Sequence, residues 1–381
     1  MKLTAAFLAL TVCALVALGL GTLVSISSES RFVNQNLNLG IAMFCAAPVF
    51  YVFKSSVLTG KKATAALVTL LIVLIVVGLA IVHVPGLSRD IVKGAVRWIY
   101  IPIAGRKFSF QPSEVVKVAF IVLLAWWMQG PARKRPSHLN RVFKPFAGLG
   151  FVAVGFYLQS DYGSIIMLSA VAVPVMLLGG AKFHHAIWYC VGAVALLAVL
   201  IATNPTRLSR IESFWNPEKA TPAERYQIEQ SHRALTSGGA FGVGYGDSIF
   251  KNDYLPENHT DFVFAMIGEE WGFAGSVFCL VLYMAFLLLG LTITAYAPDL
   301  FSALISFGLT LQICLAAGVN IGMVAGMLPT KGLALPFISY GGSNLLCSIV
   351  SAAILISICL RCKRRRFQGV SGSSAADLLP V

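Results

Sequence analysis

The sequence predicts an all-α membrane protein that crosses the bilayer many times. Of its 381 residues, 57% are hydrophobic and only 12% are charged, whereas soluble domains carry roughly 25% charged residues. Several apolar runs are long enough to cross a bilayer, which takes about 20 residues per helix. This composition excludes a soluble globular domain, and it excludes a disordered chain, which would be poor in apolar residues.

Ten apolar runs follow one another, and each is interpreted as a membrane-spanning helix. The first begins at Thr4 after a short basic start. It is long for a signal peptide and lacks a convincing cleavage site, so we expect a retained helix. The run at 262–295 is too long for one upright span and must tilt, bend or project from the bilayer. The runs cover residues 4–26, 37–53, 63–84, 113–129, 146–160, 162–180, 184–203, 262–295, 302–327 and 340–360.

Basic residues set the predicted orientation. With ten spans, both termini and every even-numbered loop lie on one side of the membrane. That side collects 15 Lys and Arg residues, with clusters at 133–144 and 361–366, so the positive-inside rule makes it cytoplasmic. These loops explain the net charge of +13, and we predict no nucleic-acid partner. We expect one transmembrane domain over residues 1–362, in contact with membrane lipid, and a flexible cytoplasmic tail over 363–381.

Two long loops are predicted on the outer side, at 85–112 and at 204–261, between the seventh and eighth helices. The first carries five basic residues against one aspartate, contrary to the charge rule. An anionic ligand and tolerated, solvated charge explain this excess about equally well. In the second loop, Thr221-Pro222-Ala223-Glu224 has the pattern of a helix start, and a helix is expected to about Thr236.

A glycine-rich stretch follows that helix at 239–246. It follows a helix rather than a strand, so it is not a dinucleotide-binding fingerprint. Its backbone N–H groups could form an anion-binding nest, or the stretch could be a flexible connector, which we favour.

Ionisable residues at predicted spans are costly to bury, so they are candidate functional residues. By this topology most of the acids lie in the outer half of the membrane, whereas a proton relay would need acids at several depths. A polar pocket that opens to the outer face fits better, and it suits a ligand with a polar headgroup and an apolar tail. The candidates are Glu114, Lys117, Asp161, Asp261, Glu269, Glu270 and Lys331.

These candidates differ in what they suggest. Asp261 stands at a loop–helix junction, where ionisation costs little, and a carboxylate there can act as a general base or hold a cation. Glu114 and Lys117 are three residues apart on one helical face and can form a structural ion pair or contribute to a site. For Glu269 and Glu270, helix packing or an ion pair is favoured over catalysis. No histidine or cysteine cluster supports a zinc site.

The segment YLPENHTDF at 254–262, with GEEWG at 268–272, resembles the signature of the SEDS family, which comprises FtsW, RodA and SpoVE. Further stretches resemble the family in the same order. Ser160 departs from the pattern, because the family usually has proline before this aspartate. The further stretches are GAVRW at 94–98, QPSE at 111–114, QSDYG at 159–163, PTKG at 329–332 and PFISYGGS at 336–343.

The resemblance implies a peptidoglycan glycosyltransferase that polymerises lipid II at the outer face of the bacterial plasma membrane. Its implied partner is a class B penicillin-binding protein, which cross-links the glycans. Details at 244–251, 266–270 and 329–332 are more similar to FtsW than to RodA, which implies a place at the division septum among division-complex proteins. A RodA-like role in elongation or a SpoVE-like role would use the same chemistry.

Within this family the resemblance implies that Asp261 takes the proton from the acceptor sugar hydroxyl. A divalent cation, Mg²⁺ or Mn²⁺, is a candidate helper at the pyrophosphate, although the sequence shows no metal site. Candidates for binding substrate or pyrophosphate are Arg97, Arg210, Glu114, Lys117, Lys331 and Ser343. Residues expected in supporting positions are Asp161, His259, Thr260, Glu269 and Glu270.

Two other functions remain open at this point. A transporter that flips lipid II would explain the ten spans and the basic outer loop about as well. It would also need polar sites reachable from the inner side, where the spans carry few ionisable residues. A membrane scaffold for the division complex is the third alternative.

Overall fold

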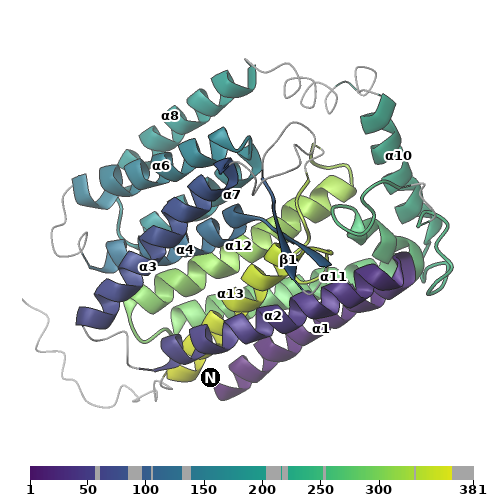
Figure 1. Cartoon of the computed structure of the whole chain (residues 1–381), viewed down its shortest axis with the longest axis horizontal. Helices are drawn as coiled ribbons and strands as arrows, with labels where there is room; N and C mark the ends of the chain where they lie inside the picture. Colours follow the sequence, from purple (N-terminus) through teal and green to yellow (C-terminus); the bar gives the residue numbers. More distant parts are fainter. Residues whose placement is uncertain are drawn as a thin grey trace, which may run out of the picture.

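The chain folds into a bundle of long helices that run side by side, shown in the computed structural model in Figure 1. The structure describes residues 1–55, 61–84, 97–103, 106–130, 139–202, 216, 222–251, 255–329 and 332–362. The long helices are α1 (Lys2–Ile26), α2 (Glu29–Lys54), α3 (Lys61–Ala80), α4 (Pro112–Gln129), α6 (Lys144–Leu158), α7 (Tyr162–Leu178), α8 (Phe183–Ala202), α10 (Pro222–Ser237), α11 (Val263–Ala295), α12 (Leu300–Val324) and α13 (Gly342–Arg361).

Three shorter elements complete the described chain. A 3-10 turn, η2 (Ile81–His83), ends α3, and a π-helical turn, η3 (Leu139–Phe143), leads into α6. An antiparallel hairpin of β1 (Ile99–Ile103) and β2 (Arg106–Phe110) precedes α4, with Ile99 opposite Phe110. The hairpin lies in the predicted first outer loop, where the sequence analysis expected no strands.

The predicted all-α, polytopic architecture is confirmed. Each of the ten apolar runs falls on a helix, and α10 adds the helix expected in the second outer loop. Eight described helices are long and apolar enough to span a membrane, and α7 is a shorter apolar helix of 17 residues. The count of exactly ten spans stays a prediction.

One end of the bundle gathers the segments predicted to be cytoplasmic. The Cys359 thiol lies 3.3 Å from the Met1 carbonyl. Arg361 donates to the Phe53 carbonyl at 3.2 Å, and its guanidinium lies 3.7 Å from the Asp299 carboxylate. The ends of α2 and α13 therefore meet the starts of α1 and α12, as the predicted even number of crossings requires. The proposed tail, 363–381, lies outside the described residues.

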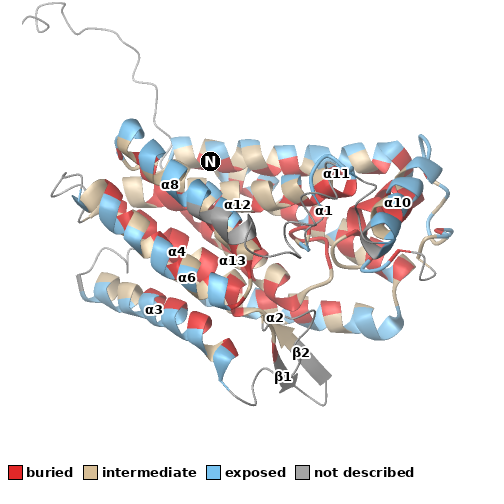
Figure 2. Ribbon diagram, turned by 90° about the horizontal axis from the view of Figure 1, so that it is seen from above, coloured by how far each residue is buried: buried red, intermediate tan, exposed pale blue. Residues whose placement is uncertain are grey.

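Buried side chains line the interior of the bundle, and exposed faces point outward (Figure 2). Fully buried residues such as Leu8, Ile121 and Leu309 come from different helices of one core. The outward faces are also apolar: Phe278 and Val281 of α11 are both more than half exposed. Contiguous exposed apolar faces are stable in lipid rather than in water, which agrees with a multi-pass membrane protein.

The long run at 262–295 forms α11, which has 33 residues and bends at Gly272, where φ is 67° and ψ is −161°. At a rise of 1.5 Å per residue a straight helix of this length would reach about 50 Å, well beyond the roughly 30 Å hydrocarbon core. The length of this run predicted that the helix tilts, bends or projects from the bilayer, and a bend is observed.

The glycine-rich stretch packs against this bend and is not a flexible connector. The bend separates backbone groups that a straight helix would pair with each other. Val243 N–H donates to the Glu269 carbonyl at 3.0 Å, and Phe273 N–H donates to the Gly239 carbonyl at 2.9 Å. A Cβ atom on Gly242 would overlap the main chain at Glu270, so only glycine fits. Because these N–H groups are used within the protein, the anion-nest alternative is also not supported.

Candidate active site

Asp261 lies in a tight turn immediately before α11. The Glu257 carbonyl accepts the N–H groups of Thr260, Asp261 and Phe262, each at 3.2 Å. Glu257 reaches this geometry with a φ of 58°, an unusual value for a residue with a side chain. The turn leaves Asp261 half-buried, while the next nine residues, Phe262 to Glu270, are all buried.

A second segment, residues 332–341, clamps the Asp261 turn from the other side. The side-chain amide of Asn320 donates to the Asp261 carbonyl at 2.8 Å and to the Leu333 carbonyl at 2.6 Å. Tyr340 N–H donates to the His259 carbonyl at 2.9 Å. Contacts from α12 and from the 332–341 segment thus fix the backbone that carries the proposed base.

The Asp261 carboxylate lies directly over Gly332. A Cβ atom built on Gly332 would stand 2.8 Å from Asp261 Oδ2, which is closer than a Cβ atom normally approaches an oxygen. The absence of a side chain at position 332 therefore makes room for the carboxylate, and the two predicted motifs, HTDF and PTKG, meet at this point.

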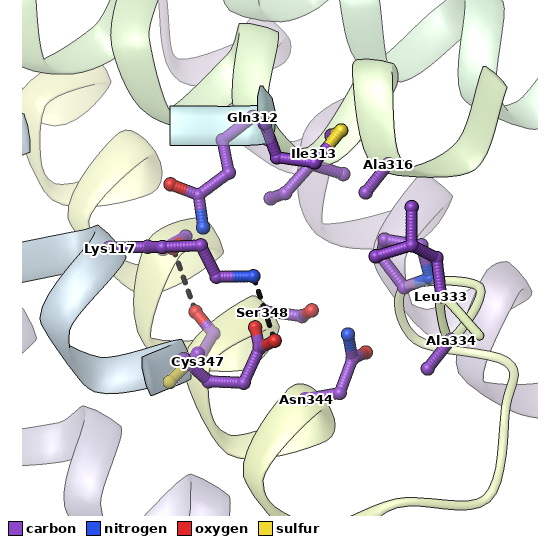
Figure 3. Close-up of a pocket in the computed structure, with 13 residues that line it drawn as sticks. Lys117, Gln312, Ile313, Ala316, Leu333, Ala334, Asn344, Cys347 and Ser348 are labelled. Atoms are coloured by element: carbon purple, nitrogen blue, oxygen red, sulfur yellow. Dashed lines mark hydrogen bonds and ion pairs between the residues drawn. The ribbon is translucent and has the colours of Figure 1, made fainter. Parts of the chain in front are cut away.

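A pocket begins where the segment after Gly332 turns inward, and Figure 3 shows its lining. It is a small pocket that is partly open to solvent. The side chains of Lys117, Gln312 and Asn344 point toward its middle (Figure 3). The lining comes from α4, α7, the 333–336 segment, α12 and α13, and comprises Glu114, Lys117, Met167, Gln312, Ile313, Ala316, Leu333, Ala334, Pro336, Asn344, Cys347, Ser348 and Ser351.

The pocket combines one buried ion pair with neutral polar groups. Lys117 Nζ lies 2.7 Å from Glu114 Oε1, and the two side chains are 8% and 13% exposed. The buried oxygens of the Gln312 and Asn344 side chains have no hydrogen-bond partner within the described residues. Buried polar atoms are normally paired, so these amides are available to water or to a ligand.

Asp161 holds the turn between α6 and α7 rather than facing the pocket. It caps α7 and accepts hydrogen bonds from the Ser164 hydroxyl at 2.7 Å and the Ser113 hydroxyl at 3.1 Å. Arg97 donates to the carbonyls of Gln159 and Ser160 in the same turn. At least two N–H donors of Arg97 are therefore used in hydrogen bonds within the protein.

Ser343 connects this turn region to the start of α13. Its hydroxyl accepts the N–H of Gln111 at 2.7 Å, and the Gln111 side chain reaches Asp161 Oδ2 at 3.4 Å. Ser343 is 1% exposed. It joins two elements of the pocket wall and stands next to Asn344, which lines the pocket.

Glu269 and Glu270 are both buried and both hydrogen-bonded, but to different parts of the chain. Glu269 accepts from the Ser248 hydroxyl and from the N–H of Ile249 at 2.7 Å. Glu270 accepts from the Ser25 hydroxyl of α1. Their positions agree with the packing role that the sequence analysis favoured.

His259 and Thr260 complete the turn without reaching across the pocket. His259 Nδ1 lies 3.1 Å from Asn258 Oδ1, and its ring stands 5.8 Å from that of Tyr340. Burial, with a smaller effect of the Arg31 charge, lowers the pKa of His259 below its usual 6.5. The Thr260 hydroxyl donates to the Glu257 carboxylate at 2.9 Å.

Several residues that build the site were missed by sequence reasoning. Asn320, Gln312 and Asn344 are neutral amides within or beside apolar runs, and unlike an ionisable residue an uncharged amide in such a run does not stand out as costly to bury. The hairpin had a signal as well, because short runs rich in aromatic and β-branched residues flank Ala104-Gly105. Arg210 and Lys331 lie outside the described residues.

No metal site is built from the part of the chain that the structure describes: no group of three or more His, Cys, Asp or Glu side chains is close enough to hold an ion. The proposed cation therefore has no identified set of ligands among these residues.

Comparisons with known proteins agree with this architecture. A family model for FtsW, RodA and SpoVE, described as "Cell cycle protein", matches residues 3–364. The probable peptidoglycan glycosyltransferase FtsW of Geobacter sp. (strain M18) is 36% identical over 283 residues, which is 74% of this chain and 76% of that protein. The protein of the same name from Thiomicrospira cyclica is 34% identical over 369 residues, 92% of this chain and 90% of its own.

Solved structures share the fold over nearly the whole chain. The rod shape determining protein RodA of Thermus thermophilus matches with a TM-score of 0.64 and 25% identity, over 93% of this chain and 96% of that one. A chain from a structure titled "Structural coordination of polymerization and crosslinking by a peptidoglycan synthase complex" matches with a TM-score of 0.72 and 24% identity, over 94% and 98%.

Proposed function

This chain belongs to the FtsW, RodA and SpoVE family of cell cycle proteins, and from that membership we propose that it polymerises lipid II at the outer face of the plasma membrane. Relatives that share about a third of its residues are named probable peptidoglycan glycosyltransferases, and this is its enzyme class. The same names favour the FtsW-type role in septal synthesis over a RodA-like or SpoVE-like role.

The proposed reaction transfers a glycosyl group to a sugar hydroxyl. Asp261 accepts the proton of the acceptor GlcNAc 4-hydroxyl, whose oxygen attacks C1 of the donor MurNAc. The bond from C1 to the pyrophosphate oxygen breaks, and undecaprenyl pyrophosphate leaves with the electron pair. The configuration inverts, so an α-linked donor becomes a β-1,4 glycan. General-base catalysis of this kind contributes roughly 10²–10⁴ in rate.

One observation carries this proposal: the Asp261 carboxylate lies over Gly332, and the segment that follows Gly332 becomes a wall of the polar pocket. By the predicted topology the half-buried carboxylate lies at the outer end of α11, within reach of water and near the lipid headgroups. The pocket has both apolar walls and polar groups, as a ligand with a sugar headgroup and a lipid tail requires.

Lys117 is the proposed stabiliser of the leaving pyrophosphate, because it is the described cation whose side chain points into the pocket. Glu114 holds the Lys117 ammonium in place at 2.7 Å. Arg97 is assigned instead to the support of the 159–161 turn. Arg210 and Lys331 stay candidates for the pyrophosphate. A class B penicillin-binding protein and division-complex proteins are the proposed partners.

The test is polymerisation of labelled lipid II by the purified protein with its penicillin-binding partner. Asp261→Ala and Asp261→Asn are expected to lower chain growth by at least 100-fold. Glu229→Gln is the control, because Glu229 is an exposed carboxylate on α10 that pairs with Arg233. Full chain growth by Asp261→Ala would refute the assignment of the base.

A second arrangement of the assay separates the enzyme from a lipid II transporter. Vesicles receive lipid II only on the face that Asp261 is expected to occupy. Glycan chains made there without transport support the transferase, whereas movement of lipid II with no polymer supports the flippase. Depletion in cells separates the roles: filaments indicate septal synthesis, and rounded cells indicate elongation.

A further inference from the structure

Two adjacent buried glutamates on α11 bind different parts of the chain. Glu269 and Glu270 are 0% and 2% exposed. Glu269 receives its donors from the segment at 248–250, which precedes the Asp261 turn. Glu270 accepts hydrogen bonds from Ser25 of α1 and from the backbone of Gly246, and the Lys251 charge lies near it. The two residues therefore form a pair for comparison: both are buried carboxylates, but the hydrogen bonds from 248–250 go to Glu269.

Glu269 accepts three hydrogen bonds on its two carboxylate oxygens. The Ser248 hydroxyl donates to Oε2, while the N–H groups of Ile249 and Phe250 donate to Oε1 at 2.7 and 3.4 Å. The Ser248 oxygen in turn accepts the N–H of Lys251 at 3.2 Å. Hydrogen bonds to a carboxylate are among the strongest in proteins, so the 248–251 turn is fixed to α11 at this point.

Further hydrogen bonds connect the 248–251 turn to the Asp261 turn. Leu255 N–H donates to the Phe250 carbonyl at 3.3 Å, and the Asn258 side chain donates to the Lys251 carbonyl at 3.4 Å. Asn258 also contacts His259, two residues before Asp261. These contacts run from Glu269 through the 248–251 turn to Asn258 and His259, whose main chain continues to Asp261 just before α11.

We propose that Glu269 is a positioning residue, which fixes the segments at 248–251 and 255–262 to α11 and thereby holds the Asp261 carboxylate over Gly332. The expected effect of Glu269 on catalysis rests on the proposed function. Its expected effect on the position of the loop does not. Catalytic groups must be held to within about 0.5 Å by the residues around them, and Glu269 is the buried group that closes this loop onto the helix. The carboxylate of Glu269 does not touch the substrate.

The experiment compares Glu269→Ala, Glu269→Gln and Glu270→Ala in the full-length protein with its partner. Hydrogen–deuterium exchange at residues 255–262 reports the position of the loop. Glu269→Ala is expected to raise this exchange at least tenfold, and Glu269→Gln less, because its remaining oxygen still accepts from Ile249. Glu270→Ala is expected to raise exchange in α1 and around Gly246, and to change exchange at 255–262 less than Glu269→Ala does.

Lipid II kinetics give the second readout. A displaced base lowers kcat without removing substrate contacts, so Glu269→Ala is expected to lower kcat by at least tenfold while KM stays within threefold. Glu269→Gln is expected to recover part of the loss. A variant with wild-type exchange at 255–262, or with kcat within twofold of wild type, would overturn the proposal.

Two further variants distinguish failure of the Glu269 proposal from failure of the proposed function. If Glu269→Ala fails to fold, Ser248→Ala removes one donor without changing a buried charge, and unchanged exchange at 255–262 in that variant would also overturn the proposal. Asp261→Asn tests the base independently. If Asp261→Asn polymerises normally, the proposed function fails, while the exchange data still decide whether Glu269 holds the loop.

Discussion

The side-chain amide of Asn320 binds the main-chain carbonyl of Asp261, with 2.8 Å between Nδ2 and oxygen. The same amide reaches the Leu333 carbonyl at 2.6 Å. A single buried residue in the outer part of α12 therefore fastens the start of α11 to the segment that forms one wall of the pocket. The position of the Asp261 carboxylate depends on this residue although Asn320 is far from it in sequence.

Asn320→Ala is expected to lower the polymerisation kcat by roughly 10–100-fold, because two partly buried carbonyls lose their donor at a cost of about 1–3 kcal/mol. The measurement is the rate of glycan synthesis from labelled lipid II. Ser306→Ala is the matched control: Ser306 is also buried in α12, and its hydroxyl has no partner in the described part of the chain. Equal rates for the two variants would contradict the role of Asn320.

Gly332→Ala is expected to inactivate the enzyme with little loss of stability. The new methyl group would stand 2.8 Å from Asp261 Oδ2, and the carboxylate is the easier of the two to displace. The control is Gly318→Ala in α12, where no atom lies within 4 Å of the added carbon. Thermal unfolding and kcat are measured on both. Wild-type activity of Gly332→Ala would mean that the carboxylate works from another position.

The Glu114–Lys117 pair is tested by a double-mutant cycle. Glu114→Gln or Lys117→Met alone leaves a buried charge without its partner and is expected to cost about 3–5 kcal/mol of stability. The double variant restores stability because neither charge remains. If Lys117 stabilises the leaving pyrophosphate, the double variant stays inactive in spite of its stability. If the double variant recovers both stability and activity, the Glu114–Lys117 pair has only a structural role.

Protonation of His259 is expected to destabilise the folded protein. Burial and the nearby Arg31 charge lower the pKa of His259 below 6.5, so the unfolded chain binds the proton more readily than the folded one. The stability is complete above pH 6.5 and falls as the pH drops from there toward the folded pKa. Thermal unfolding of wild type and His259→Gln between pH 7.5 and 5.5 checks this. The difference between the two curves should change with pH over this interval.

The helices were predictable because hydropathy and capping are local properties. Residues 113–129 predicted α4, observed at Pro112–Gln129, and the pattern at 221–224 predicted the helix that became α10. Glu114 and Lys117 pair as their spacing suggested. These features depend on residues a few positions apart, so the sequence alone contains them.

The contacts around Asp261 were not predictable in the same way. Asn320 carries no charge, and its two partners are 59 and 13 residues away, so no local pattern marks it. The stretch at 239–246 has the composition of a flexible loop, yet the bend of α11 offers it unpaired backbone groups, and tertiary hydrogen bonds override the local tendency. Basic charge at 85–112 fitted an anionic ligand or solvated charge equally well; Arg97, whose side chain is the one described among the five, donates to carbonyl groups of a turn.

The parts of α11 before and after the bend at Gly272 are expected to tolerate substitutions differently. Every residue from Val263 to Glu270 is buried, so this stretch has no permissive side and all eight positions should resist replacement. Beyond it, protected positions recur every three or four residues at Gly272, Gly275, Cys279, Tyr283, Phe286, Gly290 and Ile293, one stripe along a cylinder. A saturation scan should therefore change from continuous intolerance to a periodic pattern at one glycine, and that change would mark where the helix leaves the protein interior and begins to face lipid.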